Sequence, residues 1–223
     1  MAKKKLVRYE EIHNFPNVIY TEIVDAENRI VSRNWDERSF EKEQETVMEI
    51  GCGRGEYCID LARRNPHKNY VGVDLKADRL YIGALKAKEE GLTNVMFVRI
   101  RVEYLIPFLQ DQRLSEAWIT FPDPHLCNEN GKRRLTSPRF LEIYKRLVKP
   151  GGGIHLKTDD DTLYHFSMES IGNSPAEIIH ATDNLYNEGF RHPELTDIQT
   201  TYEKRFLAES KTIKYINFSF QKP

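Results

Sequence analysis

Three acidic residues stand where apolar, strand-like runs end, and they are the side chains best placed to do chemistry. Glu49 lies at the end of one run, Asp74 at the end of the next, and Asp123 follows a later run. In open α/β sheets, ligands bind outside the carboxyl ends of the strands. The three carboxylates therefore predict one ligand-binding edge.

Asp123 lies between Pro122 and Pro124. Each proline fixes its own φ and disfavours the helical region for the residue before it. The pattern predicts a stiff, extended backbone that presents the acid. A basic cluster, Lys132 to Arg134, begins eight residues after Pro124, which favours a site for a polyanion. An ordinary turn after a core strand is the alternative.

A glycine loop separates Glu49 from the next predicted helix, with Gly51, Gly53 and Gly55 at alternate positions. A dinucleotide fingerprint has the form G-x-G-x-x-G; here the third glycine comes one residue early and an acid precedes the first. Glu49 would oppose a pyrophosphate but suits a cationic ligand with hydroxyl and amine groups. Asp74, nineteen residues after Gly55, can accept hydrogen bonds from ribose hydroxyls. A dehydrogenase, or glycines that merely allow close packing, remain the alternatives.

Strands and helices must alternate to position these residues. Apolar runs predict strands at 46–50, 69–74, 95–100, 116–121, 153–158 and 212–220, the last as an edge strand. Helices are expected from Cys58, over 77–90 with Gly91 as the stop, from Ser137-Pro138 with the serine hydroxyl as cap, and over 162–171 and 202–209. Strands separated by helices indicate βαβ units in a mostly parallel sheet. Residues 1–45 are less regular and are interpreted as an N-terminal extension, with a helix end at 41–45, before a catalytic domain at 46–223.

Composition narrows the protein class. The chain has 223 residues, 39% hydrophobic and 30% charged, with a formal net charge of −1. It shows no apolar run long enough to span a bilayer and no secretory signal. Three cysteines without CxxC spacing indicate neither a disulfide framework nor a zinc site. We expect a cytoplasmic protein without a metal, a membrane or an obligate protein partner, as a monomer or homodimer.

The glycine loop together with Glu49 and Asp74 resembles class I S-adenosylmethionine-dependent methyltransferases. Four later motifs occur in the order found in bacterial tRNA (guanine-N7)-methyltransferases, and the similarity runs from about Thr46 to the C-terminus. They are Phe121-Pro122-Asp123-Pro124, Lys132-Arg133-Arg134-Leu135-Thr136, Leu156-Lys157-Thr158-Asp159, and Thr200-Thr201-Tyr202-Glu203-x-Arg205-Phe206.

The resemblance implies a three-layer Rossmann-like fold with a mostly parallel seven-stranded sheet and an antiparallel C-terminal strand. It implies methyl transfer from S-adenosylmethionine to N7 of a variable-loop guanine in tRNA. By motif match the cofactor contacts are Glu49, Asp74 and Asp123 with the glycine loop, and Asp123 is also the catalytic residue. The tRNA or guanine contacts are Asp159, Thr200, Thr201, Tyr202 and Glu203, with Lys132 and Arg133 also assigned to the substrate. The Lys132–Arg134 cluster would contact phosphate.

Two positions depart from the family pattern. Cys127 stands where a substrate-binding lysine is expected, with Lys132 or Arg133 as a substitute, and Arg101 stands where an acid or amide often approaches the adenine. Neither role is carried over. A methyltransferase for another RNA and a catalytically silent RNA-binding protein remain alternatives. Thr200 and Glu203 also fit a capping box for the last helix.

Guanine N7 carries a lone pair and no proton, so its methylation needs no base to expose the nucleophile. Catalysis can come from positioning and from stabilising the charge that moves onto the purine. The expected role of Asp123 is therefore orientation and charge stabilisation.

Overall fold

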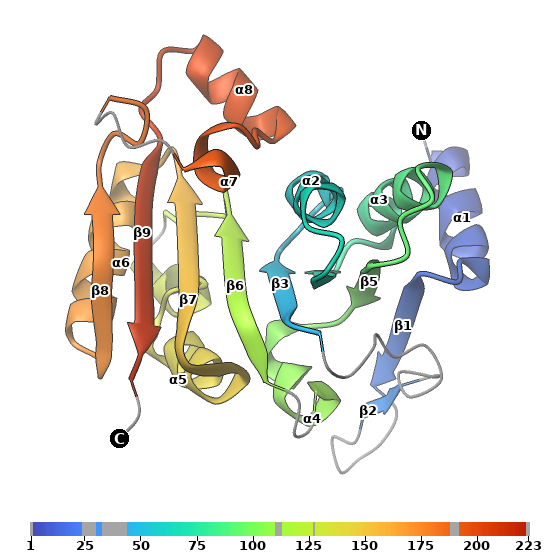
Figure 1. The fold of residues 1–223 in the computed structure, drawn as a ribbon, viewed down its shortest axis with the longest axis horizontal. Coiled ribbons are helices and arrows are strands. Elements are labelled where there is room, and N and C mark those ends of the chain that lie inside the picture. The colour runs from blue at the N-terminus through green and yellow to red at the C-terminus, as the bar shows by residue number, and fades with distance from the viewer. Residues whose placement is uncertain are drawn as a thin grey trace. The chain divides into compact units, whose positions relative to one another are not determined.

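The computed structural model describes residues 2–23, 30–32, 44–109, 113–126, 128–187 and 192–221. The chain forms two compact units, Met1–Gln112 and Arg113–Pro223. In each unit, strands alternate with helices (Figure 1).

The first unit contains five strands in the order β2-β1-β5-β4-β3. They are β1 (Val18–Ile23), β2 (Ile30–Ser32), β3 (Thr46–Ile50), β4 (Asn69–Asp74) and β5 (Val95–Arg99). Strands β3, β4, β5 and β1 run parallel, and β2 pairs antiparallel with β1. The helical elements are α1 (Ala2–Glu11), η1 (Ile12–Asn14), α2 (Glu56–Arg64), α3 (Ala77–Glu89), η2 (Val102–Tyr104) and α4 (Leu105–Leu109).

Burial explains why these strands read as apolar runs. Nearly every residue of β3, β4 and β5 is buried, as expected for parallel strands covered on both faces. Helix α3 places Leu80, Ala84 and Ala87 in the core at helical spacing. It ends where predicted, at Gly91, whose φ of 68° is left-handed.

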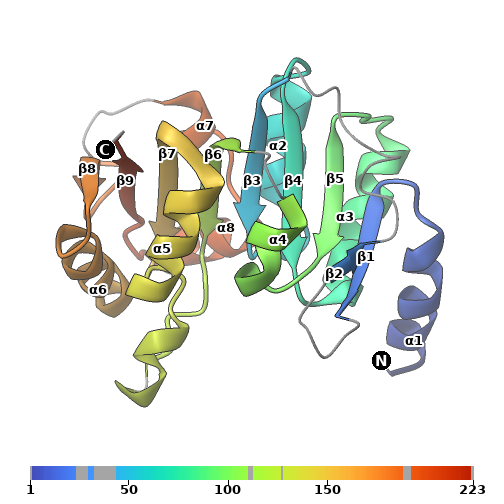
Figure 2. The ribbon, with the colours of Figure 1, turned by 90° about the horizontal axis from the view of Figure 1, so that it is seen from below.

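The described residues before Thr46 hold more regular structure than the sequence indicated. Strand β1 extends the parallel sheet beside β5, and α1 packs against α3 (Figures 1 and 2). Most of the helix end expected at 41–45 lies outside the described residues; Gln44 and Glu45 are not helical.

The second unit contains four strands in the order β6-β7-β9-β8. They are β6 (Leu114–Thr120), β7 (Val148–Thr158), β8 (Ala176–Thr182) and β9 (Lys214–Phe220). Strands β6 and β7 are parallel, and β9 runs antiparallel to β7 and β8. The helical elements are η3 (Asn128–Arg133), α5 (Pro138–Leu147), α6 (Asp161–Gly172), α7 (Pro193–Thr196) and α8 (Thr201–Ala208). Helices α5 and α6 lie on one face of these strands (Figures 1 and 2).

Three local predictions are wrong. Strand β9 is not an edge strand: it lies between β7 and β8, and six of its seven residues are buried. Ser137 precedes α5 as expected, but its hydroxyl donates to the Lys132 carbonyl and does not cap the helix. The structure describes nine strands where seven were expected; β1 and β2, which precede Thr46, are the additional ones.

No helix of the described part is long and apolar enough to cross a membrane.

Candidate active site

The glycine loop after β3 has a backbone that only glycine adopts easily. The φ angles of Gly51, Gly53 and Gly55 are 74°, 56° and 64°, all in the left-handed region that penalises a side chain. At Gly55 an added Cβ would also lie 2.3 Å from the ring of Phe97. The loop therefore needs glycine at all three positions for its backbone conformation, and at Gly55 also for close packing.

Asp74 closes this loop against the end of β4. One carboxylate oxygen accepts a hydrogen bond from the Gly53 N–H at 2.9 Å, and the other accepts from the Lys76 N–H at 2.8 Å. The backbone N–H groups of Gly51 and Cys52 donate to the Val73 carbonyl. The two strand ends are thus joined, and the predicted ribose-binding acid is held in one orientation.

Glu49 caps helix α2 from the neighbouring strand. The residue is 2% exposed, and its carboxylate accepts a hydrogen bond from the Cys58 N–H at 2.9 Å. Gly55 offers the helix no capping side chain, so Glu49 satisfies a free donor of the first turn and complements the helix dipole. Burial raises the pKa of the Cys52 and Cys58 thiols well above its ordinary value, and the Glu49 carboxylate raises it further.

Two further glycines pack close to this loop but were not singled out from the sequence. A Cβ at Gly72 in β4 would lie 2.9 Å from the Cys52 sulfur, and one at Gly83 in α3 would lie 2.5 Å from the Arg54 carbonyl. The sequence carried a signal for both positions, because a glycine inside a strand or helix is destabilising and often marks a place where another segment approaches the backbone closely.

In the second unit, the loop after β6 presents Asp123. The Asp123 side chain is 73% exposed, and its carboxylate accepts a hydrogen bond from the His125 N–H at 3.0 Å. The predicted extended backbone is wrong at both ends of the loop, because Phe121 and His125 have φ angles of 49° and 45°. Left-handed non-glycine residues are strained and occur preferentially at functional sites.

Three motifs that lie far apart in the sequence meet at this loop. The Phe121 N–H donates to the carbonyl of Lys157 in β7 at 2.8 Å. The Phe121 ring lies 5.7 Å, centroid to centroid, from the ring of Phe206 in α8. The carboxyl ends of β6 and β7 and the last helix therefore form one continuous structure.

Lys157 and Glu203 form a fully buried ion pair beneath that junction. Their side chains have 0% exposure, and the ammonium lies 2.7 and 2.9 Å from the two carboxylate oxygens. Lys157 also donates to the carbonyls of Leu195 and Ile198, and Glu203 accepts from the hydroxyl of Tyr186 at 2.7 Å. Burial lowers the pKa of Lys157, and the Glu203 carboxylate opposes that effect.

The segment 200–203 has two faces. Thr200 caps α8 by accepting a hydrogen bond from the Glu203 N–H at 3.1 Å, as the capping motif predicted. Thr201 and Tyr202 are exposed, and the guanidinium of Arg205 stacks 5.4 Å from the Tyr202 ring centroid. Thr201 and Tyr202 therefore lie at the surface, whereas the Glu203 carboxylate is engaged inside the protein.

Asp159 follows β7 and is also partnered within the unit. Its carboxylate lies 2.9 Å from the Lys211 ammonium, which raises the lysine pKa. Lys214 donates to the Asp159 carbonyl at 3.0 Å and pairs with Asp161 at 2.9 Å. A substrate that used Asp159 would exchange contacts with the exposed Lys211.

The basic cluster divides in the structure. Lys132 and Arg133 are exposed, whereas Arg134 is 6% exposed and points inward. Of the two departures from the family pattern, Cys127 lies outside the described residues, and Arg101 is exposed 3.9 Å from Glu103.

A polar network on β7 was not expected. The His155 ring stacks on Trp118 at a centroid distance of 4.1 Å and hydrogen bonds to the Tyr215 hydroxyl at 2.7 Å. Burial, with a smaller contribution from His192, lowers the His155 pKa to about 3. The Glu116 carboxylate, 3.3 Å from the ring, acts in the opposite direction.

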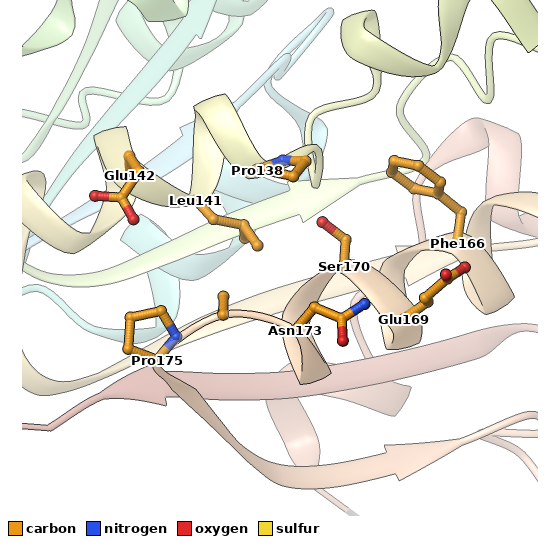
Figure 3. Close-up of a pocket in the computed structure, with 9 residues that line it drawn as sticks. Pro138, Leu141, Glu142, Phe166, Glu169, Ser170, Asn173 and Pro175 are labelled. Atoms are coloured by element: carbon orange, nitrogen blue, oxygen red, sulfur yellow. The ribbon is translucent and has the colours of Figure 1, made fainter.

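A groove of about 320 Å³ lies between α5 and α6 (Figure 3). Its walls include Leu141 and Phe166, and none of the predicted site residues lines it. The groove is therefore separate from the candidate active site.

Comparison with known proteins identifies the fold and the family. Similar solved structures include the 16S rRNA methyltransferase KamB, with a TM-score of 0.62 and 14% identity over 91% of this chain and 100% of that one. Another is a variant of the 16S rRNA (adenine(1408)-N(1))-methyltransferase from Catenulisporales acidiphilia with its cosubstrate SAM, with a TM-score of 0.60 and 15% identity over 87% and 94% of the two chains. The predicted α/β class I methyltransferase fold is thus confirmed.

Residues 43–216 match the family described as "Putative methyltransferase". The tRNA (guanine-N(7)-)-methyltransferase of Christiangramia forsetii is 38% identical over 99% of both chains. That of Porphyromonas gingivalis is 40% identical over 85% of this chain and 77% of the relative. The chain belongs to the tRNA (guanine-N7)-methyltransferase family, as the sequence motifs indicated.

Proposed function

We propose that this protein methylates N7 of a variable-loop guanine in tRNA, in the cytoplasm, with residues 46–223 as the catalytic domain. The observation that carries the proposal is the convergence of the Asp123 loop, the end of β7 and helix α8, through Phe121, Lys157 and Phe206. The names of the relatives support tRNA as the substrate class and guanine N7 as the target atom.

The residues of the first unit fit S-adenosylmethionine. The glycine loop leaves no side chains at its three turning positions, and Asp74 holds a carboxylate beside it for a ribose. When bound, the cofactor supplies a methyl group on a sulfonium centre. Glu49 and Asp74 place negative charge near such a cation, and we assign them, with Asp123, to its binding.

The residues of the second unit receive the guanine. Asp123 is exposed on a strained loop whose two ends are held by hydrogen bonds. A carboxylate there accepts hydrogen bonds from the Watson–Crick edge of guanine and stabilises the positive charge that the purine gains. No proton leaves N7, so Asp123 acts by orientation and electrostatics.

The remaining tRNA contacts are proposed mainly at residues whose side chains are exposed. Thr201 and Tyr202 are exposed on the same helix whose cap is Thr200. Lys132 and Arg133 are exposed after the Asp123 loop and are assigned to phosphates. Asp159 is assigned to substrate binding, in which the substrate would replace its contact with Lys211. Glu203 is assigned an indirect role, because it holds helix α8 in place.

Methyl transfer from labelled S-adenosylmethionine to unmodified tRNA tests the proposal, followed by borohydride–aniline cleavage, which reports 7-methylguanine. We expect cleavage in the variable loop, and no cleavage with tRNA whose variable-loop guanine is replaced. Label in tRNA without cleavage would identify a different methylated atom. Stabilisation by the cofactor without any transfer would identify a silent RNA-binding protein.

Asp123→Asn tests the catalytic assignment, with the exposed Asp183→Asn after β8 as the matched control. We expect the single-turnover rate to fall for Asp123→Asn alone and the wild-type rate to stay flat between pH 6 and 8. A wild-type rate that follows the ionisation of one group near neutrality would contradict the absence of a general base.

A further inference from the structure

Arg134 is the inward-facing member of the basic cluster. The residue is 6% exposed, while Lys132 and Arg133 beside it are exposed. Burying a guanidinium is costly unless its donors are satisfied. The partners of Arg134 therefore indicate why it is buried.

The donors of Arg134 are directed at the loop that presents Asp123. Its Nε donates to the Pro124 carbonyl at 2.9 Å, and an Nη donates to the His125 carbonyl at 3.2 Å. Its guanidinium carbon lies 4.5 Å from the ring centroid of Phe166 in α6, within cation–π range. The planar fork of arginine matches this arrangement, whereas a lysine ammonium is a point charge without a stacking plane.

The segment that holds Arg134 is itself anchored. The Tyr144 hydroxyl donates to the Leu135 carbonyl at 2.9 Å, and the Ser170 hydroxyl donates to the Thr136 carbonyl at 2.7 Å. The side chain of Thr136 hydrogen bonds to Ser167 at 2.7 Å. Arg134 thus connects the loop to a base fixed on α5 and α6.

The Asp123 loop needs such support. Two of its residues have left-handed φ angles, and its prolines lack N–H donors. Strained backbone persists only where the surroundings hold it. Arg134 donates to the carbonyls of the two residues that follow Asp123, whereas the Phe121 contact with Lys157 holds the other end of the loop.

We infer that Arg134 is a positioning residue that fixes Asp123 for catalysis and does not contact tRNA phosphate. The catalytic consequence of this inference rests on the proposed function. The restraint of the loop by Arg134 does not depend on that function. A displacement of about 1 Å in a catalytic group can cost on the order of 100-fold in rate. We expect Arg134→Lys to lower kcat roughly 10- to 100-fold while leaving the salt dependence of KM for tRNA unchanged.

Arg133→Gln is the matched control, because it removes an exposed charge from the adjacent position. Arg133→Gln removes one of the proposed phosphate contacts, so the slope of log KM against log salt should fall by about 1. Steady-state kinetics at several salt concentrations separates the two variants. A reduced salt slope with unchanged kcat in Arg134→Lys would show a phosphate contact and overturn the inference.

Hydrogen exchange gives a readout that is independent of activity. The His125 amide, which donates to Asp123, should exchange faster in Arg134→Lys, while amides of β6 and β7 keep their wild-type protection. Faster exchange throughout β6 and β7, or no change at the loop, would overturn the inference. If the wild-type protein does not methylate tRNA, the proposed function fails, and the exchange experiment still decides whether Arg134 holds the loop.

Discussion

Replacing Lys157 by Met should destabilise the protein more than most single substitutions. The change leaves the Glu203 carboxylate fully buried and, among the side chains that the structure describes, with the Tyr186 hydroxyl as its donor. Removing one partner of a buried ion pair costs about 3–5 kcal/mol, because the other charge stays desolvated. We expect Lys157→Met to lower the free energy of unfolding by that amount.

Glu203→Gln should cost less, about 1.5–3 kcal/mol, which is the range for a hydrogen bond to a charged group. The reason is that Lys157 keeps the carbonyls of Leu195 and Ile198 as acceptors. The double variant Lys157→Met with Glu203→Leu removes both charges and should be more stable than Lys157→Met alone.

Urea denaturation followed by circular dichroism measures these variants, and Glu203→Leu as the second single variant completes the double-mutant cycle. The control is Lys204→Met, an exposed lysine on the same helix, which should stay within about 0.5 kcal/mol of wild type. A cost below about 1 kcal/mol for Lys157→Met, or a double variant equal to the sum of the single changes, would refute the reasoning.

Three further predictions concern other parts of the fold. Gly55→Ala should cost about 2–5 kcal/mol, from a left-handed alanine and a steric clash, whereas Gly131→Ala, with open space around its Cβ, should be neutral in the same urea assay. The His155 pKa is lowered to about 3 in the folded protein, so as pH falls below about 6.5 the imidazole becomes protonated in the unfolded chain first. The free energy of unfolding should therefore fall by up to about 2 kcal/mol between pH 6.5 and 5. Parallel curves of stability against pH for wild type and His155→Gln would contradict this. Cys52 and Cys58 are buried with raised pKa values, so both should resist iodoacetamide until urea is added; peptide mass spectrometry showing native labelling would refute it.

Local sequence patterns were enough to predict helix ends and buried strands. Gly91 ends α3 and Thr200 caps α8 because a left-handed residue and a capping hydroxyl act on their immediate neighbours. The buried parallel strands β3, β4 and β5 were readable as apolar runs. The order of motifs around Asp123 was enough to identify the family.

Contacts between distant segments could not be read in this way. The sequence of strand β9 alternates like that of an edge strand, yet β8 is the edge strand of this unit. The residues of β8 are mostly less buried, and it carries the polar residues Glu177 and His180. Nothing local in the sequence pairs β9 with β7 or assigns Glu49 to the cap of α2, because these partners are chosen by packing.

The basic cluster shows the same division at the level of single side chains. The sequence by itself determined that Lys132, Arg133 and Arg134 form a concentrated positive charge a few residues after an acid that lies between two prolines. Only the tertiary structure decided that Arg134 turns inward to the carbonyls after Asp123 while its neighbours face solvent. The physical reason is that a run of like residues has no local signal for direction. The Phe166 ring and the carbonyls of Pro124 and His125, brought close by folding, select which arginine is buried.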